Sequence, residues 1–195
     1  MPHLFALLFL LAATPFWEAK PCADWSEEEL LEFMGNSPWA QPAESVGSRR
    51  SGAIQAFLAT AKPMQAAELE YRRRRLPKDT PADPSWDEFQ EFLARDATKY
   101  LVLAVSIPIA ASQDAREMAT MENDSFLRLG KQKIKMSGYF PPSPTDPWTR
   151  LIFPRKDFKG VKEFDFEIYV PGTGTSYRQV FFRLKEMTYR GQLEM

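Results

Sequence analysis

The sequence predicts an α+β fold, with a mostly antiparallel sheet of about five to seven strands and two to three helices packed on it. The strongest evidence is segment 163–170 (EFDFEIYV), where apolar and polar residues alternate as in a half-buried strand. A Gly-rich turn at 171–176 then leads back into a second strand at 177–184. The apolar run 100–107 (YLVLAVSI) indicates a strand covered on both faces, which we take as the centre of the sheet.

The C-terminal part is expected to form a β-meander. An even-sum register of the two alternating strands opposes Phe164 with Phe182. Glu163 then faces Arg183, so packing and charge agree. Further short strands of this part are expected near 134–136, 150–153 and 188–193, with a rigid Pro-rich connector at 141–147.

Helix signals precede this part of the chain. Ser26 and Glu29 form a capping box, which predicts a helix of about two turns that stops at Gly35. A second capping box, Ser85 with Glu88, predicts a helix that runs to about residue 97. Two more helices are expected, from Pro63 to about Arg75 and from Ser112 to Leu129.

The four arginines at 72–75 resemble a phosphate-binding patch. Consecutive helical residues point to different sides, however, and Glu68 and Glu70 precede Arg72 and Arg74 by four residues. This pattern favours a solvated face with salt bridges over a phosphate site.

The N-terminal run 4–17 (LFALLFLLAATPFW) is uncharged but too short to span a membrane, which needs about 20 apolar residues. We read residues 1–19 as a secretory signal peptide, with a cut after Ala13, Thr14 or Ala19; the alternative is a helix packed in the core. Export to the periplasm or medium would leave an arm with one short helix at 20–52 and a single α+β domain at 53–195. Cys22, the only cysteine, is then a free thiol or an intermolecular link.

Composition narrows the function. The chain has 25 Lys and Arg against 26 Asp and Glu, so it lacks the basic excess typical of nucleic-acid binding. No membrane span is expected in the mature chain. The single histidine, His3, lies in the predicted signal peptide, and its loss would exclude Ser-His-Asp catalysis and zinc sites that use histidine. No cofactor is predicted. Carboxylate chemistry, a Lys or Tyr base, and oxygen-ligated Ca²⁺ or Mg²⁺ sites remain open.

Three segments resemble a group of uncharacterised exported bacterial proteins. They are the W-S-x-E-E-L...S-P-W-A arrangement at 25–40, T-A-K-P-M-Q-A-A at 60–67, and M-T-Y-R-G-Q-L-E at 187–194. The resemblance covers most of the predicted mature chain. It implies bacterial export and one compact domain, and it supplies no activity or site residues.

Two function classes follow. The first is a non-catalytic binding or scaffolding domain for a protein, peptide or saccharide, with the proline-flanked Trp39 and Trp148 or an aromatic sheet face as contacts. The alternative is a carboxylate-dependent hydrolase of the glycosidase type, with Asp165 and Glu167 as first candidates. A cleft with two carboxylates, one of raised pKa, would favour the hydrolase. A flat sheet with an exposed aromatic patch would favour binding.

Overall fold

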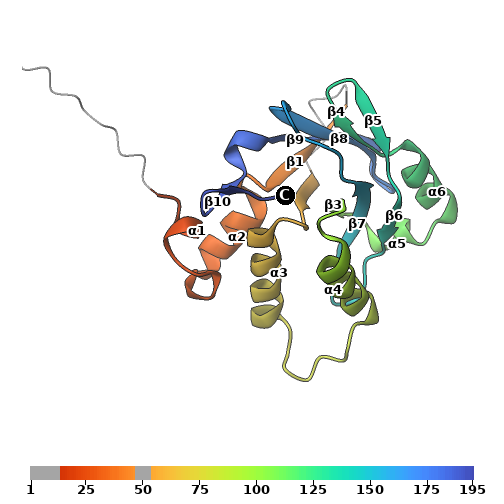
Figure 1. Ribbon diagram of the computed structural model, residues 1–195. Coiled ribbons are helices and arrows are strands. Elements are labelled where there is room, and N and C mark those ends of the chain that lie inside the picture. The colour runs from red at the N-terminus through yellow and green to blue at the C-terminus, as the bar shows by residue number, and fades with distance from the viewer. Residues whose placement is uncertain (1–13, 47–53) are drawn as a thin grey trace, which may run out of the picture.

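A computed structural model describes residues 14–46 and 54–195 of the chain. Its main feature is one sheet of nine strands in the order β5-β4-β8-β9-β1-β2-β3-β7-β6, and every neighbouring pair is antiparallel (Figure 1). The strands are β1 (Ala40–Ser45), β2 (Ile54–Leu58), β3 (Tyr100–Ser106), β4 (Phe126–Leu129), β5 (Gln132–Lys135), β6 (Gly138–Phe140), β7 (Trp148–Pro154), β8 (Glu163–Tyr169) and β9 (Tyr177–Arg183).

Six α-helices accompany the sheet in the described part of the chain. They are α1 (Phe16–Ala19), α2 (Glu27–Gly35), α3 (Lys62–Arg75), α4 (Pro84–Asp96), α5 (Ile109–Ser112) and α6 (Ala115–Asp124). The capping box of α2 is confirmed, since Ser26 Oγ accepts from Glu29 N and Glu29 Oε2 accepts from Ser26 N. Helix α4 begins one residue before the predicted box, with Asp83 as its N-cap.

The expected fold of five to seven strands with two to three helices was wrong, because the sheet has nine strands and the described residues form six helices. One missed strand is β1, whose Pro42 disfavours a strand. Pro42 is tolerated because β1 pairs with β2 over 40–43 but with β9 only at 44–45. Another is β4, which lies at the end of the helix predicted for 112–129.

The expected C-terminal β-meander was also wrong. Strands β8 and β9 pair in the predicted register, with Phe164 opposite Phe182. Strand β7, however, lies between β3 and β6 rather than beside β8. Strand β3 is buried along most of its length, as predicted, but the middle position of the sheet belongs to β1.

The sheet curls into a half-barrel, which brings its two ends close together. Strands β5 and β6 lie at opposite ends of the strand order, yet only Met136 and Ser137 separate them in the chain. Met136 N donates to Ser125 O beside β4 (3.1 Å), and Ser137 N donates to Ile152 O on β7 (2.8 Å). Phe153 of β7 and Phe166 of β8 meet inside the curl, with ring centroids 4.9 Å apart.

The outer face of β2, β3 and β7 carries a second apolar layer, with α3 and α4 on that side (Figure 1). Phe57, Ala104 and Arg150 share this face, because they are successive partners across the three strands. Phe89 and Phe92 of α4 pack on Phe140 of β6, each with ring centroids 5.4 Å apart. Burial on both sides explains the continuous apolar run of β3.

Part of the predicted signal peptide packs on the domain. Phe16 contacts Trp25 and Trp17 contacts Phe33, with centroids 5.2 and 5.6 Å apart. The carboxylate of Glu18 accepts from the backbone N–H of Arg190 (2.9 Å). A cut after Ala19 would remove these contacts, whereas a cut after Ala13 or Thr14 would keep them. His3 lies outside the described residues.

No helix in the described segments is long and apolar enough to cross a membrane. The C-terminus ends in a two-stranded ladder, β10 (Thr188–Tyr189) with β11 (Gln192–Leu193). Its tight turn uses Arg190 and Gly191, both with positive φ, as a type I′ hairpin turn requires.

Candidate functional site

Trp39 is a core residue. Its side chain is fully buried, packs on Phe33 with centroids 5.6 Å apart, and donates from Nε1 to the carbonyl of Glu194 (2.8 Å). The indole therefore links the start of β1 to the C-terminal segment by a hydrogen bond. Because it is fully buried, it is not accessible to a ligand.

Trp148, in contrast, lines a groove at one end of the sheet. It opens β7, lies opposite Ser106 of β3, and is half-buried against Phe57 (4.8 Å between ring centroids). The groove has a volume of about 460 Å³. It is lined by Ile54, Gln55, Ser106, Ile107, Pro108, Trp148 and Thr173. Of the two tryptophans proposed from the sequence, only Trp148 faces an open groove.

Asp165 and Glu167 lie on the solvent side of β8, in an ion-pair ladder with β4 and β5. Glu167 accepts from Arg128 and from Lys133 (2.7 Å), and Asp165 accepts from Gln179 Nε2 (2.7 Å). Partial burial raises the pKa of Asp165. Burial acts in the same direction on Glu167, but hydrogen bonds from Lys133 and Arg128 outweigh it and lower the pKa. Each carboxylate thus serves a cross-strand contact.

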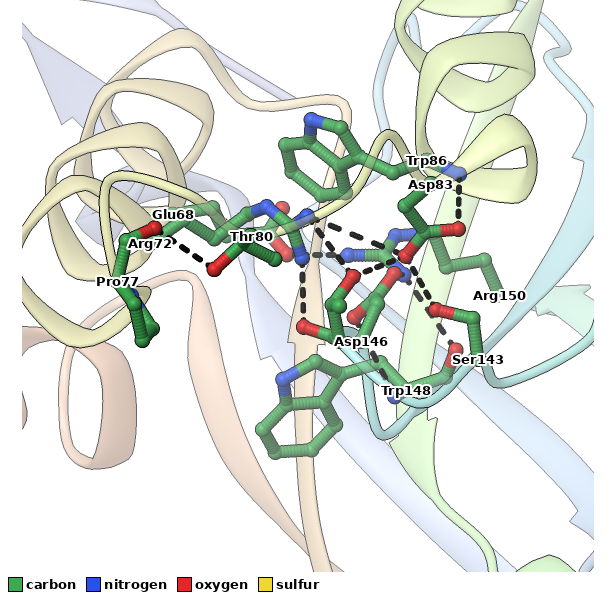
Figure 2. Close-up of polar contacts among 11 residues, drawn as sticks. Glu68, Arg72, Pro77, Thr80, Asp83, Trp86, Ser143, Asp146, Trp148 and Arg150 are labelled. Carbon is green, nitrogen blue, oxygen red and sulfur yellow. Dashed lines mark hydrogen bonds and ion pairs between the residues drawn. The ribbon is translucent and has the colours of Figure 1, made fainter.

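A second charged cluster is buried between the helices and β7 (Figure 2). Its centre is Arg150, which is only 1% exposed. Nη2 donates to Glu68 Oε1 of α3 at 2.6 Å, and Nη1 donates to Asp146 in the connector before β7. The guanidinium also lies over the ring of Phe89 from α4, 4.3 Å from its centroid. Helices α3 and α4, both distant from β7 in the sequence, thus converge with the adjoining connector on one side chain.

Arg72 of α3 forms the outer layer of this cluster. Its guanidinium stacks on Trp86 at 4.1 Å and donates from Nη1 to Thr145 O at 2.7 Å. Asp83, the N-cap of α4, lies 4.0 Å from Arg72 Nη2 and accepts from Ser143 (2.5 Å) and Thr145. In Figure 2 these charged groups lie between the indoles of Trp86 and Trp148.

The cluster holds three carboxyl groups and two guanidinium groups, so one bound proton makes it neutral. Glu68 is the group poised to hold that proton. Burial and, to a smaller extent, the charge of Asp146 raise the pKa of Glu68 to about 7 against the attraction of Arg150. The Oε2 atom of Glu68 and the Nε atom of Arg150 are buried, and neither has a hydrogen-bond partner among the described residues.

Glu68 and Asp146 meet one sequence criterion for a hydrolase, because they are neighbouring carboxyl groups and one has a raised pKa. The pocket beside them, however, has a volume of about 20 Å³, which is the space of about one water molecule. Both groups are also held by the same guanidinium. The arrangement suits a structural charge network better than a site that must admit a sugar ring.

Sequence reasoning missed this cluster. It noted Glu68 and Arg72 as a spacing for a surface salt bridge, but Glu68 instead pairs with Arg150, 82 positions away. The second spacing was right, since Arg74 Nε donates to Glu70 at 2.6 Å. One signal could have indicated it. Arg150 lies within an otherwise mostly apolar strand (WTRLIFP), and an arginine that such a strand buries needs a carboxylate partner.

Comparisons of the chain with protein-family models, with curated proteins and with solved structures found no match.

Proposed function

We propose that the protein is an exported, non-catalytic binding domain that takes a neutral saccharide in the groove at Trp148. The observation that carries this proposal is the lining of the groove. An indole and three aliphatic residues lie beside two side-chain hydroxyls and one side-chain amide, and none of the described lining residues is ionisable.

Such a lining suits a ligand with apolar faces and many hydroxyl groups. A sugar ring can stack on the face of an indole, while its hydroxyls exchange hydrogen bonds with Ser106 and donate to the amide oxygen of Gln55. The amide nitrogen of Gln55 already donates to the carbonyl of Met34 (2.5 Å). Thr173 already donates from Oγ1 to the carbonyls of Val170 and Thr175, which fixes its orientation in the wall of the groove. A charged ligand would find no counter-charge on these residues.

The buried cluster around Arg150 contacts the residue that lines the groove, Trp148. Trp148 lines both the groove and the small pocket beside Glu68. Its backbone N–H points to Asp146 Oδ1, and its carbonyl faces Arg150 Nη1, each at 3.4 Å. These weak contacts hold the backbone of Trp148, and its ring packs on Phe57, so the indole is positioned before a ligand arrives.

The test is titration of the purified chain with neutral and charged oligosaccharides, followed by tryptophan fluorescence and calorimetry. We expect binding of a neutral oligosaccharide that W148A weakens by about tenfold or more, since stacking on an aromatic ring contributes about 1 to 3 kcal/mol. W148F should keep part of the affinity.

The matched control is F181A, which removes an aromatic ring that is 52% exposed on β9, away from the groove lining. It should leave the affinity unchanged. Equal losses in W148A and F181A, or binding of charged saccharides alone, would contradict the proposal.

A further inference from the structure

We propose a second binding site, for a phosphate monoester that carries an apolar group, in a cavity of about 610 Å³ beside the start of β8 and the end of β9. Its lining is Val161, Lys162, Glu163, Arg183, Leu184 and Lys185. None of these residues lines the groove at Trp148. The site is therefore separate from the one that the saccharide proposal uses.

The backbone brings the two walls of this cavity together. Leu184 N donates to the carbonyl of Lys162 at 3.0 Å, which joins the segment before β8 to the 3₁₀ turn Leu184–Glu186. This bond places Lys162 and Lys185 on opposing segments. Leu184 is buried and Val161 half-buried, so the lining also contains apolar surface.

The charges of the lining are poorly compensated. Lys162 and Lys185 form no ion pair with any described residue, and Arg183 contacts Glu186 only at 3.4 Å, with side chains 65% and 43% exposed. The single carboxylate of the lining is Glu163. Arg183 thus has the carboxylates of Glu186 and, across the strand pair, Glu163 near it, whereas Lys162 and Lys185 are the two cations of the lining without an ion-pair partner among the described residues. By contrast, each of the four arginines at 72–75 lies within 4.0 Å of a carboxylate.

Two ammonium groups without partners suit a phosphate monoester, which carries about −1.5 to −2 at pH 7. A carboxylate carries one charge for the two lysines, whereas a phosphate monoester offers up to two charges and three oxygens that can accept from both ammonium groups. The volume lies in the range of about 300 to 1,000 Å³ that is usual for small-ligand pockets. The apolar surface of Val161 and Leu184 then accommodates the organic group of the ester.

Phenyl phosphate is a suitable probe, with inorganic phosphate as its comparison. Calorimetry on the full chain at low ionic strength should show phenyl phosphate binding more tightly than inorganic phosphate, and affinity should fall as salt is added. K162Q/K185Q should weaken phenyl phosphate binding by about tenfold or more, since two charge-assisted contacts are lost.

Two variants separate this site from general charge effects. K78Q/K131Q removes the same charge from two other lysines without an ion-pair partner among the described residues, and it should leave the affinity unchanged. V161S should reduce the preference for phenyl phosphate over inorganic phosphate. Failure of both phosphates to bind the wild-type chain, or equal losses in the two double variants, would overturn the proposal.

The source of the phosphate group can be assigned with vesicles. Co-sedimentation with phosphatidylcholine vesicles that contain phosphatidic acid, lost in K162Q/K185Q and absent with phosphatidylcholine alone, would identify a lipid headgroup. Binding of phenyl phosphate without vesicle binding would identify a soluble ester. Either result supports a phosphate monoester site, and neither depends on the saccharide proposal.

Discussion

Two groups of acidic and basic side chains in this molecule use the same chemistry in opposite environments. The ladder on β4, β5 and β8 pairs Glu167 with Arg128 and Lys133, whose side chains are 28%, 34% and 55% exposed. The cluster under Trp148 pairs Glu68 and Asp146 with Arg150, whose side chains are 4%, 8% and 1% exposed. The pKa of Glu167 is lowered and that of Glu68 is raised. At Glu68 burial outweighs the attraction of Arg150, whereas at Glu167 the hydrogen bonds from Lys133 and Arg128 outweigh burial, so only Glu68 is poised to bind a proton near neutral pH.

The largest difference between the two groups is expected when the arginine is removed. R150M keeps much of the apolar stem but leaves Glu68 and Asp146 buried without their cation, so we expect a loss of about 3 to 5 kcal/mol in the free energy of unfolding. R128M, in the ladder, should cost less than about 1 kcal/mol. Urea unfolding followed by circular dichroism measures both.

A triple variant tests the cause of that loss. R150M/E68Q/D146N removes the two unpaired charges as well, and it should recover part of the stability lost in R150M. A loss in R150M no larger than in R128M would show that the buried pair does not differ energetically from the exposed one.

The pH dependence of stability should also separate the groups. The folded-state pKa of Glu68 is about 7 against an ordinary value of 4.5, so the folded chain holds a proton that the unfolded chain has lost between these pH values. The contribution of Glu68 to the free energy of unfolding is therefore complete below about pH 4.5 and is lost as the pH rises through 7. We expect a decrease on the order of 2 kcal/mol between pH 5 and 8.

Few other groups interfere in this pH range. The single histidine, His3, precedes the described residues. Glu70 and Glu167, whose pKa values are lowered, contribute stability above about pH 4.5 and lose it only at lower pH. Urea unfolding at a series of pH values should give a negative slope for the wild-type chain and a nearly flat profile for E68Q. If the free energy of unfolding of E68Q still falls between pH 5 and 8, a group other than Glu68 causes the decrease.

The sequence was informative where local patterns decide the structure. Strict alternation placed β8 and β9 and their register, and the box at Ser26 and Glu29 placed the start of α2. The sequence was less informative where pairing between strands that are distant in the chain decides the structure. The segment 126–129 satisfies a helical apolar period, yet Leu127 pairs with Phe166 of β8 and with Ile134 of β5, which makes it a strand.

The candidate site, too, was predictable only in part. A tryptophan beside prolines could be recognised in the sequence, but only the fold distinguishes buried Trp39 from Trp148 at a groove. The cluster of Glu68, Asp146 and Arg150 joins a helix, a connector and a strand. No spacing in the sequence specifies that meeting, because it depends on how α3 lies over the sheet.

The smallest effect is expected in the ladder itself. E167Q removes the charge that Arg128 and Lys133 share, and at low salt it should cost a few tenths of a kcal/mol to about 1 kcal/mol. Because these side chains reach solvent, 1 M NaCl should abolish most of the difference, as the Debye length then falls to about 3 Å. The loss in R150M should change little with salt, since the carboxylates that it leaves unpaired lie beneath the surface. Urea unfolding of E167Q and R150M at 0.05 and 1 M NaCl makes the comparison, and an E167Q effect that high salt leaves intact would mean that the ladder behaves as a buried network.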